Sequence, residues 1–237
     1  MKFGVVIFPG SNCDRDLIHV LEDVMEAEVK ILWHKEKSLH GFDTEDCVML
    51  PGGFSYGDYL RSGAIARFSP IMESVIEFAN DGGLVMGICN GFQILCEAGL
   101  LPGALVRNNG QKFSCKNVYV LPQTNHSRLT ADLDLRKPLK IPIAHAEGRF
   151  FADEKTLKKL KGNDQVLFRY CNEKGEMTDA ANPNGSLENI AGICNDKRNV
   201  FGMMPHPERA SEQALNNTDG LLLFKSLVDS VSALASR

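Results

Sequence analysis

The first hundred residues alternate between short apolar runs and stretches in which apolar residues recur at helical spacing. The apolar runs predict strands at 2–8, 28–33, 47–50 and 84–88. The helical spacing predicts helices at 14–26, 68–80 and 90–98. Strands that alternate with helices in this way are typical of a parallel sheet with crossover helices.

The second half of the chain is richer in strand patterns and ends in one helical stretch. Strands are predicted at 118–121, 139–143, 165–170, 190–194 and 200–203. Residues 219–235 predict an amphipathic helix, with an apolar stripe formed by Leu222, Leu223, Leu227, Val231 and Leu234. No repeat or linker interrupts the pattern, so we expect a single domain over residues 1–237.

The composition excludes several classes of protein. A hydrophobic fraction of 43% and a charged fraction of 24% are typical of a soluble globular protein with a sizeable core. The net charge is −4 and the basic residues are scattered, so we expect no nucleic-acid partner. The apolar start is short and stops at Pro9-Gly10, which favours a first strand over a signal peptide. No segment predicts a membrane span, so we expect no membrane partner.

Seven cysteines are spread widely through the chain. An odd number without a secretory signal favours reduced thiols in the cytoplasm. No Cys-x-x-Cys pair is present, so we predict no metal site. A cysteine with a chemical role must therefore be recognised by its position.

Cys89 stands at the junction of a predicted strand and a predicted helix, with Gly87 and Gly91 two positions to either side. This Gly-Ile-Cys-Asn-Gly stretch is the sulfur counterpart of the Gly-x-Ser-x-Gly nucleophile elbow. The helix that follows directs its free N–H groups and positive end toward the thiol, which favours the reactive thiolate. A small core residue is the alternative, but the glycines on both sides favour a nucleophile.

Two further segments supply candidates for the rest of a catalytic site. Gly53 ends a strand predicted to lie beside the elbow strand, and its N–H, with that of Asn90, is a candidate for an oxyanion hole. An ordinary flexible turn is the alternative at this position. His206 lies between two prolines that stiffen its backbone, and Glu208 lies on the same side of an extended segment, where it would orient the imidazole.

The other histidines are weaker candidates for the base. His145 has a suggestive context in Ala-His-Ala-Glu-Gly-Arg. Surface or loop positions are predicted for the remaining four, His19, His34, His40 and His126.

Three motifs in fixed order resemble a known family. Pro51-Gly-Gly53, Gly87-Ile-Cys-Asn-Gly-Phe-Gln93 and Pro205-His-Pro-Glu208 resemble those of the class I glutamine amidotransferases of the Cys-His-Glu type. Within that class, residues 8–14, 51–61, 144–149 and 203–209 resemble the glutaminase subunits that serve the synthesis of formylglycinamidine ribonucleotide. The resemblance covers nearly the whole chain. One departure is Ala146, where the family pattern has glycine, and it concerns only the local loop geometry.

The resemblance implies a flavodoxin-like α/β fold, with a mostly parallel central sheet and flanking helices. It also implies that Cys89 attacks the side-chain carboxamide of L-glutamine and forms a γ-glutamyl thioester. The backbone N–H groups of Gly53 and Asn90 would hold the oxyanion.

Proton transfer and substrate binding follow from the same resemblance. His206, oriented by Glu208, would protonate the departing ammonia and then activate water. Gln93, one helical turn past the nucleophile, would help to shape the glutamine pocket.

The chain has no Gly-x-x-x-x-Gly-Lys-Ser/Thr motif and no Gly-x-Gly-x-x-Gly turn, so we expect no cofactor in it. The resemblance implies that ATP and Mg bind to a separate synthetase subunit, which uses the ammonia to make formylglycinamidine ribonucleotide in purine biosynthesis. A small third subunit would assist. We predict weak activity in isolation and activation on docking, through residues 54–63 and 145–150.

Two other functions stay open. A stress-response or binding protein of the cysteine-elbow α/β type would share the elbow but lack Pro-His-Pro-Glu. A free-standing γ-glutamyl hydrolase would use similar catalytic residues, and only the flanking motifs argue against it.

Overall fold

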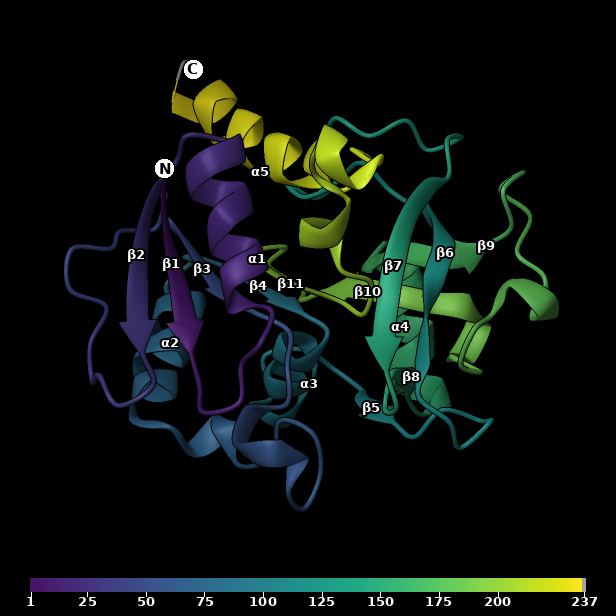
Figure 1. Ribbon diagram of the computed structural model, residues 1–237, viewed down its shortest axis with the longest axis horizontal. Coiled ribbons are helices and arrows are strands. Elements are labelled where there is room, and N and C mark those ends of the chain that lie inside the picture. Colours follow the sequence, from purple (N-terminus) through teal and green to yellow (C-terminus); the bar gives the residue numbers. More distant parts are fainter. Residues whose placement is uncertain (236–237) are drawn as a thin grey trace.

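Nine strands form one sheet, whose two halves differ in strand direction (Figure 1). The structure is a computed structural model that describes residues 1–235 and the side chains of residues 1–229. The strand order is β2-β1-β3-β4-β11-β10-β9-β6-β7, and Figure 1 shows β2 and β1 at the left and β6, β7 and β9 at the right. Their bounds are β1 Lys2–Ile7, β2 Glu28–Trp33, β3 Cys47–Leu50, β4 Leu84–Ile88, β6 Ser114–Pro122, β7 Leu139–His145, β9 Val166–Cys171, β10 Ile190–Cys194 and β11 Val200–Met203.

The first five strands in this order, β2 to β11, are all parallel. Every residue of β3, β4 and β11 is buried, as expected for parallel strands that are covered on both faces. The crossovers carry α1 (Asp14–His19, continued by a π-helical turn over Val20–Val24), α2 (Pro70–Asn80) and α3 (Asn90–Glu97). The sequence prediction for this half is confirmed, strand by strand and helix by helix.

The remaining strands, β10, β9, β6 and β7, extend the sheet with antiparallel pairs. Short connections such as 195–199 between β10 and β11 reverse the chain, whereas a parallel pair needs a longer crossover. The α/β class and the parallel core are therefore confirmed, within a sheet that is mixed as a whole.

Three elements of the second half were not predicted. The strands β5 (Ala104–Val106) and β8 (Arg149–Phe151) pair with each other outside the main sheet, and are too short to show a period. Helix α4 (Glu154–Gly162) buries only Leu160, so its apolar pattern is weak. It is instead initiated by a cap, since the Asp153 side chain accepts a hydrogen bond from the Thr156 N–H at 2.7 Å.

The last helix, α5, spans Leu221–Ala235 and starts two residues later than predicted. Leu223 and Leu227 are buried as predicted, whereas Leu222 is exposed. The side chains of Val231 and Leu234 lie outside those that the structure describes. No helix within residues 1–235 is both long and apolar enough to cross a membrane.

Candidate active site

The predicted site residues meet at the carboxyl ends of neighbouring parallel strands, where open α/β sheets bind their ligands. Strands β4 and β11 pair in register, with Ile88 opposite Met203. Cys89 directly follows β4, and His206 lies three residues beyond β11. Residues 117 positions apart in the sequence are thus neighbours because their strands are neighbours.

Cys89 occupies the strained turn that the sequence predicts. Its backbone has φ 50° and ψ −102°, a conformation that costs a non-glycine residue on the order of 1–3 kcal/mol. The turn is held on the strand side by a 2.8 Å hydrogen bond from the Cys89 N–H to the Met203 carbonyl. A Cβ atom at Gly91 would lie 1.9 Å from the Leu50 carbonyl oxygen, and one at Gly87 would lie 2.5 Å from the Gly91 backbone. Both glycines are therefore required by close backbone packing.

The thiol of Cys89 is 5% exposed and opens onto a cavity of about 260 Å³. Its sulfur lies 3.8 Å from the Ala144 carbonyl oxygen, so the end of β7 forms the wall opposite the elbow. The cavity is lined by Gly53, Phe54, Asp58, Ser62, Cys89, Gln93, Arg107, Ala144, His145, Ala146 and Glu147.

His206 and Glu208 form a buried pair beside the thiol. Glu208 Oε1 lies 2.6 Å from His206 Nδ1, and both side chains are at most 2% exposed. Burial lowers the pKa of His206, but the charge of Glu208, followed by the Cys89 and Cys13 thiols, raises that pKa well above its ordinary value. The second ring nitrogen, Nε2, is buried without a hydrogen-bond partner among the described residues. This leaves one nitrogen tied to the carboxylate and the other available for proton transfer.

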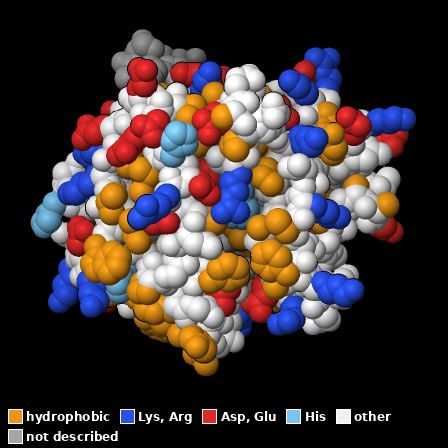
Figure 2. All heavy atoms as spheres, viewed as in Figure 1, with side chains coloured by type: hydrophobic (Ala, Val, Ile, Leu, Met, Phe, Trp, Pro, Cys, Tyr) orange, Lys and Arg blue, Asp and Glu red, His pale blue; other side chains and the backbone are white. Residues whose placement is uncertain are grey.

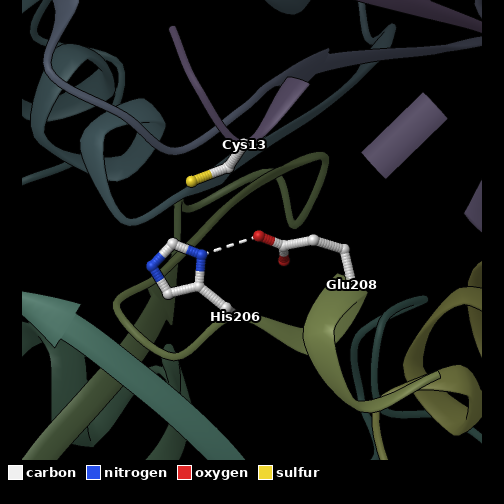
Figure 3. A group of neighbouring side chains, drawn as sticks. All are labelled: Cys13, His206 and Glu208. Carbon is white, nitrogen blue, oxygen red and sulfur yellow. Dashed lines mark hydrogen bonds and ion pairs between the residues drawn. The ribbon is translucent and has the colours of Figure 1, made fainter. Parts of the chain in front are cut away.

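Cys13, for which the sequence analysis assigned no role, also faces His206. Figure 3 shows the imidazole with the Glu208 carboxylate on its Nδ1 side and the Cys13 sulfur next to the ring. Cys13 follows β1, whose carboxyl end lies at the same edge of the sheet as those of β3 and β4. Cys13 belongs to residues 8–14, one of the segments that resemble the family, and this was the sequence signal that could have placed it at the site.

The potential metal-ligating atoms of Cys13, His206 and Glu208 all lie within 4.8 Å of one another. A cysteine, a histidine and a glutamate together are a combination of residue types that can hold zinc. However, the Arg209 guanidinium donates a hydrogen bond to the Cys13 sulfur at 3.1 Å. Its positive charge disfavours a cation at this point, and Glu208 already occupies His206 Nδ1. The cluster suits an acid–base group, and the absence of a metal stays a prediction.

Both residues predicted to form the oxyanion hole lie close to Cys89, Asn90 as the next residue in the chain and Gly53 in the lining of the same cavity. Asn90 is the first residue of α3, and Gly53 lines the cavity with φ 142°. A Cβ atom at Gly53 would lie 2.7 Å from the Asn12 nitrogen, so a side chain does not fit there. The Asn90 side chain has a role of its own, because its Oδ1 accepts the Ser55 N–H at 3.1 Å and ties the loop to α3.

Gln93 lines the cavity with both ends of its carboxamide engaged. Its Oε1 accepts a hydrogen bond from Asn90 Nδ2 at 2.9 Å, and its Nε2 donates to the Glu147 carbonyl at 2.6 Å. The side chain is therefore held as a wall and links α3 to the segment after β7.

His145 is a second buried histidine at the site, and the side chains within hydrogen-bond distance of its ring are neutral amides. Its Nδ1 lies 3.2 Å from Asn108 Oδ1 and its Nε2 lies 3.5 Å from Asn184 Nδ2. Burial, aided by the positive charge of His206, lowers the pKa of His145 to about 4. The ring is neutral near pH 7 and serves as a wall. Ala146 next to it has no positive φ, so the glycine of the family pattern is not needed at that position.

Side-chain hydrogen bonds anchor the loop predicted over residues 52–63 to the rest of the protein. Tyr56 places its hydroxyl 2.8 Å from His34 Nδ1 and 2.9 Å from Ser69 Oγ. His34 is 5% exposed, so the predicted surface position of this histidine is wrong. Tyr56, Asp58 and Leu60 all have positive φ, a backbone conformation that is costly for residues other than glycine and needs support from surrounding contacts.

Comparisons with known proteins agree with this geometry. The family model described as the CobB/CobQ-like glutamine amidotransferase domain matches residues 1–224. A relative from Koribacter versatilis, named phosphoribosylformylglycinamidine synthase subunit PurQ, is 55% identical over 98% of this chain and 99% of its own. A relative of the same name from Synechocystis sp. is 56% identical over 95% of this chain and 99% of its own.

Among solved structures, a chain of the PurLQS structure from Thermotoga maritima has a TM-score of 0.84 with this chain at 41% identity. The match covers 97% of this chain and 98% of that one. The similarity therefore includes both halves of the sheet.

Proposed function

This chain belongs to the CobB/CobQ-like glutamine amidotransferase family, and on that premise we propose that it is the glutaminase subunit of phosphoribosylformylglycinamidine synthase. It hydrolyses L-glutamine to glutamate and ammonia, and the ammonia passes to an ATP-dependent synthetase that makes formylglycinamidine ribonucleotide in purine biosynthesis. The observation that carries the proposal is the thiol of Cys89 on a strained turn, beside the buried pair of His206 and Glu208. The names of relatives above 50% identity support the choice within the family.

The first half of the reaction forms a γ-glutamyl thioester. Cys89 gives its proton to His206 Nε2, and its sulfur attacks the carboxamide carbon of glutamine. The N–H groups of Gly53 and Asn90 stabilise the oxyanion of the tetrahedral intermediate. The intermediate then collapses, the C–N bond breaks, and His206 donates its proton to the departing amine, which leaves as ammonia.

The second half of the reaction regenerates the thiol. His206 takes a proton from water and the hydroxide attacks the thioester carbon. The C–S bond of the second tetrahedral intermediate then breaks, and His206 returns the proton to the departing Cys89 sulfur. The products are glutamate and Cys89. Glu208 keeps the ring in one orientation and balances the positive charge each time that the imidazolium forms. Gln93 acts as a wall of the pocket that holds the substrate.

The loop at 54–63 is the proposed docking surface for the synthetase. Phe54, Tyr59 and Leu60 are 43%, 74% and 93% exposed, and Phe54 stacks on Phe113 with ring centroids 6.4 Å apart. Figure 2 shows hydrophobic side chains gathered over the lower part of this face, where the loop lies in Figure 1. Exposed aromatic and aliphatic groups around a catalytic cavity are typical of a protein interface.

The contacts of this loop explain how docking would control catalysis. Ser62 donates its hydroxyl to Glu147 Oε2 at 2.9 Å, and the Glu147 carbonyl accepts the 2.6 Å hydrogen bond from Gln93. A shift of the loop is thereby transmitted through the 145–150 segment to the pocket wall. We propose that the isolated chain is weakly active and that docking completes the pocket.

The remaining parts of the proposal concern the complex. Residues 1–237 act as a single amidotransferase domain without a cofactor, and ATP and Mg bind to the synthetase. A small third subunit completes the assembly. The proposed compartment is the cytoplasm, where the exposed Cys115 thiol would stay reduced.

Reconstitution with the cognate synthetase tests the proposal. The wild-type chain should support synthesis of the amidine from glutamine, and Cys89→Ser should abolish this while synthesis from added ammonia continues. Cys115→Ser removes an exposed thiol and is the matched control. Glutamine-dependent synthesis by Cys89→Ser would disprove the mechanism.

The alternative of a free-standing γ-glutamyl hydrolase makes a different prediction. Glutaminase activity that is equally high with and without the synthetase would favour it. The stress-response or binding alternative is disfavoured by the buried pair of His206 and Glu208, which such a protein does not need.

A further inference from the structure

Arg209, the residue after the buried pair of His206 and Glu208, joins that pair to the start of helix α1. Its Nε donates a hydrogen bond to Asp16 Oδ2 at 3.0 Å, and its Nη2 donates one to the Cys13 sulfur at 3.1 Å. Figure 3 shows that this sulfur lies next to the His206 ring. The guanidinium thus bridges the turn after β11 and the first turn of α1, although Asp16 and Arg209 are 193 positions apart.

Three turns at the same edge of the parallel sheet pack closely beside this bridge. Cys13 follows β1, Gly52 follows β3, and His206 follows β11. The Cys13 N–H donates a hydrogen bond to the Gly52 carbonyl at 3.3 Å. A Cβ atom at Gly52 would lie 2.7 Å from His206 Cε1 and 3.2 Å from the Cys13 sulfur, so no side chain fits between them. A shift at the start of α1 would therefore displace the imidazole.

The turn that carries Glu208 and Arg209 depends on outside contacts. It is a short 3-10 helix over Pro207–Ala210. Hydrogen-bond geometry is poorer in such a helix than in an α-helix, and a single turn gains little stability of its own. The Gly220 N–H, just before α5, holds one end of it through a 2.7 Å hydrogen bond to the Ala210 carbonyl. Arg209 supplies the contacts on the side of α1.

Arg209 also brings a positive charge that acts on the Glu208 carboxylate. Glu208 Oε1 contacts His206, whereas Oε2 is buried without a hydrogen-bond partner among the described residues. Burial lowers the pKa of Arg209, but the Cys13 thiol, the hydrogen bond with Asp16 and the Glu208 charge raise it above its ordinary value. Each time His206 is neutral, Glu208 is a buried anion without a charged partner in the ring, and Arg209 then supplies a positive charge near it.

We propose that Arg209 is a positioning residue for proton transfer. By binding Asp16 and Cys13 together, its guanidinium fastens the turn of Glu208 to the start of α1. The 2.6 Å contact between Glu208 and His206 is kept in this way. Lysine does not replace arginine here, because an ammonium group lacks the planar fork that reaches both partners.

This inference rests on the proposed glutaminase function and adds a residue that acts from behind the histidine. Arg209 is not among the residues that line the cavity at Cys89. Its loss should therefore affect turnover and leave the binding of glutamine nearly unchanged.

Glutamate release by the complex with the synthetase measures this effect. Arg209→Met removes the bridge and the charge, so kcat should fall about 10- to 100-fold, the worth of one charge-assisted hydrogen bond. Arg209→Lys keeps the charge, and Asp16→Asn removes one partner of the bridge, so kcat should fall about 3- to 10-fold in each. In all three variants KM should change less than about threefold, and synthesis from added ammonia should continue as in wild type.

Two further readouts separate positioning from a general loss of structure. In Arg209→Lys the NMR titration of His206 should show a lower pKa than in wild type, because the Glu208 carboxylate acts less strongly on the ring while the charge at position 209 is unchanged. Asp16→Asn should have less effect in the Arg209→Met background than alone, because both residues act through one contact. Arg136→Lys, at an exposed ion pair with Asp134, is the matched control and should behave as wild type.

Three results would overturn the inference while leaving the glutaminase function intact. The first is a wild-type kcat and an unchanged His206 titration in Arg209→Lys. The second is an effect of Asp16→Asn that is equally large with and without Arg209. The third is a change in KM alone, which would make Arg209 a binding residue. If Arg209→Met does not fold, the kcat and His206 titration of Arg209→Lys and Asp16→Asn decide the question.

Failure of the proposed function would have a different result. The wild-type complex would then make amidine from ammonia and none from glutamine, whatever residue stands at position 209.

Discussion

Two histidines meet at the active site from the two halves of the sheet, and their surroundings give them opposite properties. His206 follows β11 in the parallel half, and His145 ends β7 at the antiparallel edge. Both are at most 3% exposed. The carboxylate of Glu208 raises the pKa of His206 against the effect of burial, whereas His145 has only amide partners and its pKa falls to about 4.

The comparison shows that burial alone does not decide the charge of a histidine. A buried imidazolium needs a carboxylate within hydrogen-bond distance, and two amide side chains do not replace it. The half of the sheet that carries Cys89, the proposed nucleophile, thus also carries His206, the proposed proton-transfer group. The other half supplies a neutral wall.

The largest expected difference lies in turnover. His206→Gln should lower the kcat for glutamine hydrolysis about 10³- to 10⁵-fold, because the group that moves the proton is lost. His145→Gln should lower it about tenfold, because only the shape of the wall changes. Glutamate release by the complex measures both variants, and synthesis from ammonia should be unaffected. Equal losses in the two variants would refute the division of roles.

Removal of the carboxylate should make His206 resemble His145. Glu208→Gln retains a hydrogen-bonding group next to Nδ1 but removes its charge, so the pKa of His206 should fall and kcat should drop about 10²- to 10⁴-fold. The pH dependence of kcat and the NMR titration of His206 measure the two effects. Glu188→Gln, at an ion pair on the surface, is the control. An unchanged histidine titration would show that Glu208 does not act through charge.

The low pKa of His145 predicts a loss of stability in acid. A pKa of about 4 in the folded chain and 6.5 in the unfolded chain means that the unfolded state binds more protons between these values. The contribution of His145 is fully present above pH 6.5 and is lost as the pH falls toward 4. Between pH 7.5 and pH 4 it amounts to about 3 kcal/mol.

Urea unfolding of wild type and His145→Gln at both pH values isolates this contribution. The free energy of unfolding of wild type should fall about 3 kcal/mol more than that of the variant. His206, whose pKa is raised, contributes with the opposite sign in both proteins, and the difference between them contains only its coupling to His145. Parallel pH dependence of the two proteins would contradict the assignment.

The smallest expected effect concerns the second thiol beside His206. Cys13→Ala removes one of the groups that raise the pKa of His206, so the apparent pKa in the profile of kcat/KM should shift down by less than about one unit. The kcat should fall less than about fivefold. The exposed thiol changed in Cys115→Ala provides the control. A loss as large as that of Glu208→Gln would instead make Cys13 a principal charge partner.

Much of the parallel half could be predicted because its strands are buried on both faces and give unbroken apolar runs. The second half was predicted only as separate strands, since antiparallel pairing depends on partners far away in the sequence. The strands β5 and β8 and the helix α4 have weak patterns and were missed. The pairing of β5 with β8 and the position of α4 depend on packing against the rest of the chain.

The residues of the site also divide into those that the sequence predicts and those that it does not. Cys89, Gly53 and the His206-Pro-Glu208 segment could be predicted as candidates because their local backbone chemistry is unusual wherever they lie in the fold. The extended conformation expected for Glu208 is wrong, because Glu208 lies in a short 3-10 helix over Pro207–Ala210 and still reaches His206 from there. His34 was misjudged because nothing in its own segment indicates burial, and Cys13 was given no role because its approach to His206 joins segments far apart in the sequence. The amide partners of His145, Asn108 and Asn184, come from positions 37 and 39 residues away along the chain.

The amino-acid sequence by itself predicted Cys89 as the candidate nucleophile, its strained turn and the stiff histidine segment, since glycine, proline and strand-to-helix junctions act over a few residues. Only the tertiary structure decided which buried histidine has a carboxylate partner and which has amide partners. Those properties depend on desolvation and on charges a few ångströms away. The packing of the sheet brings such groups together from distant parts of the chain.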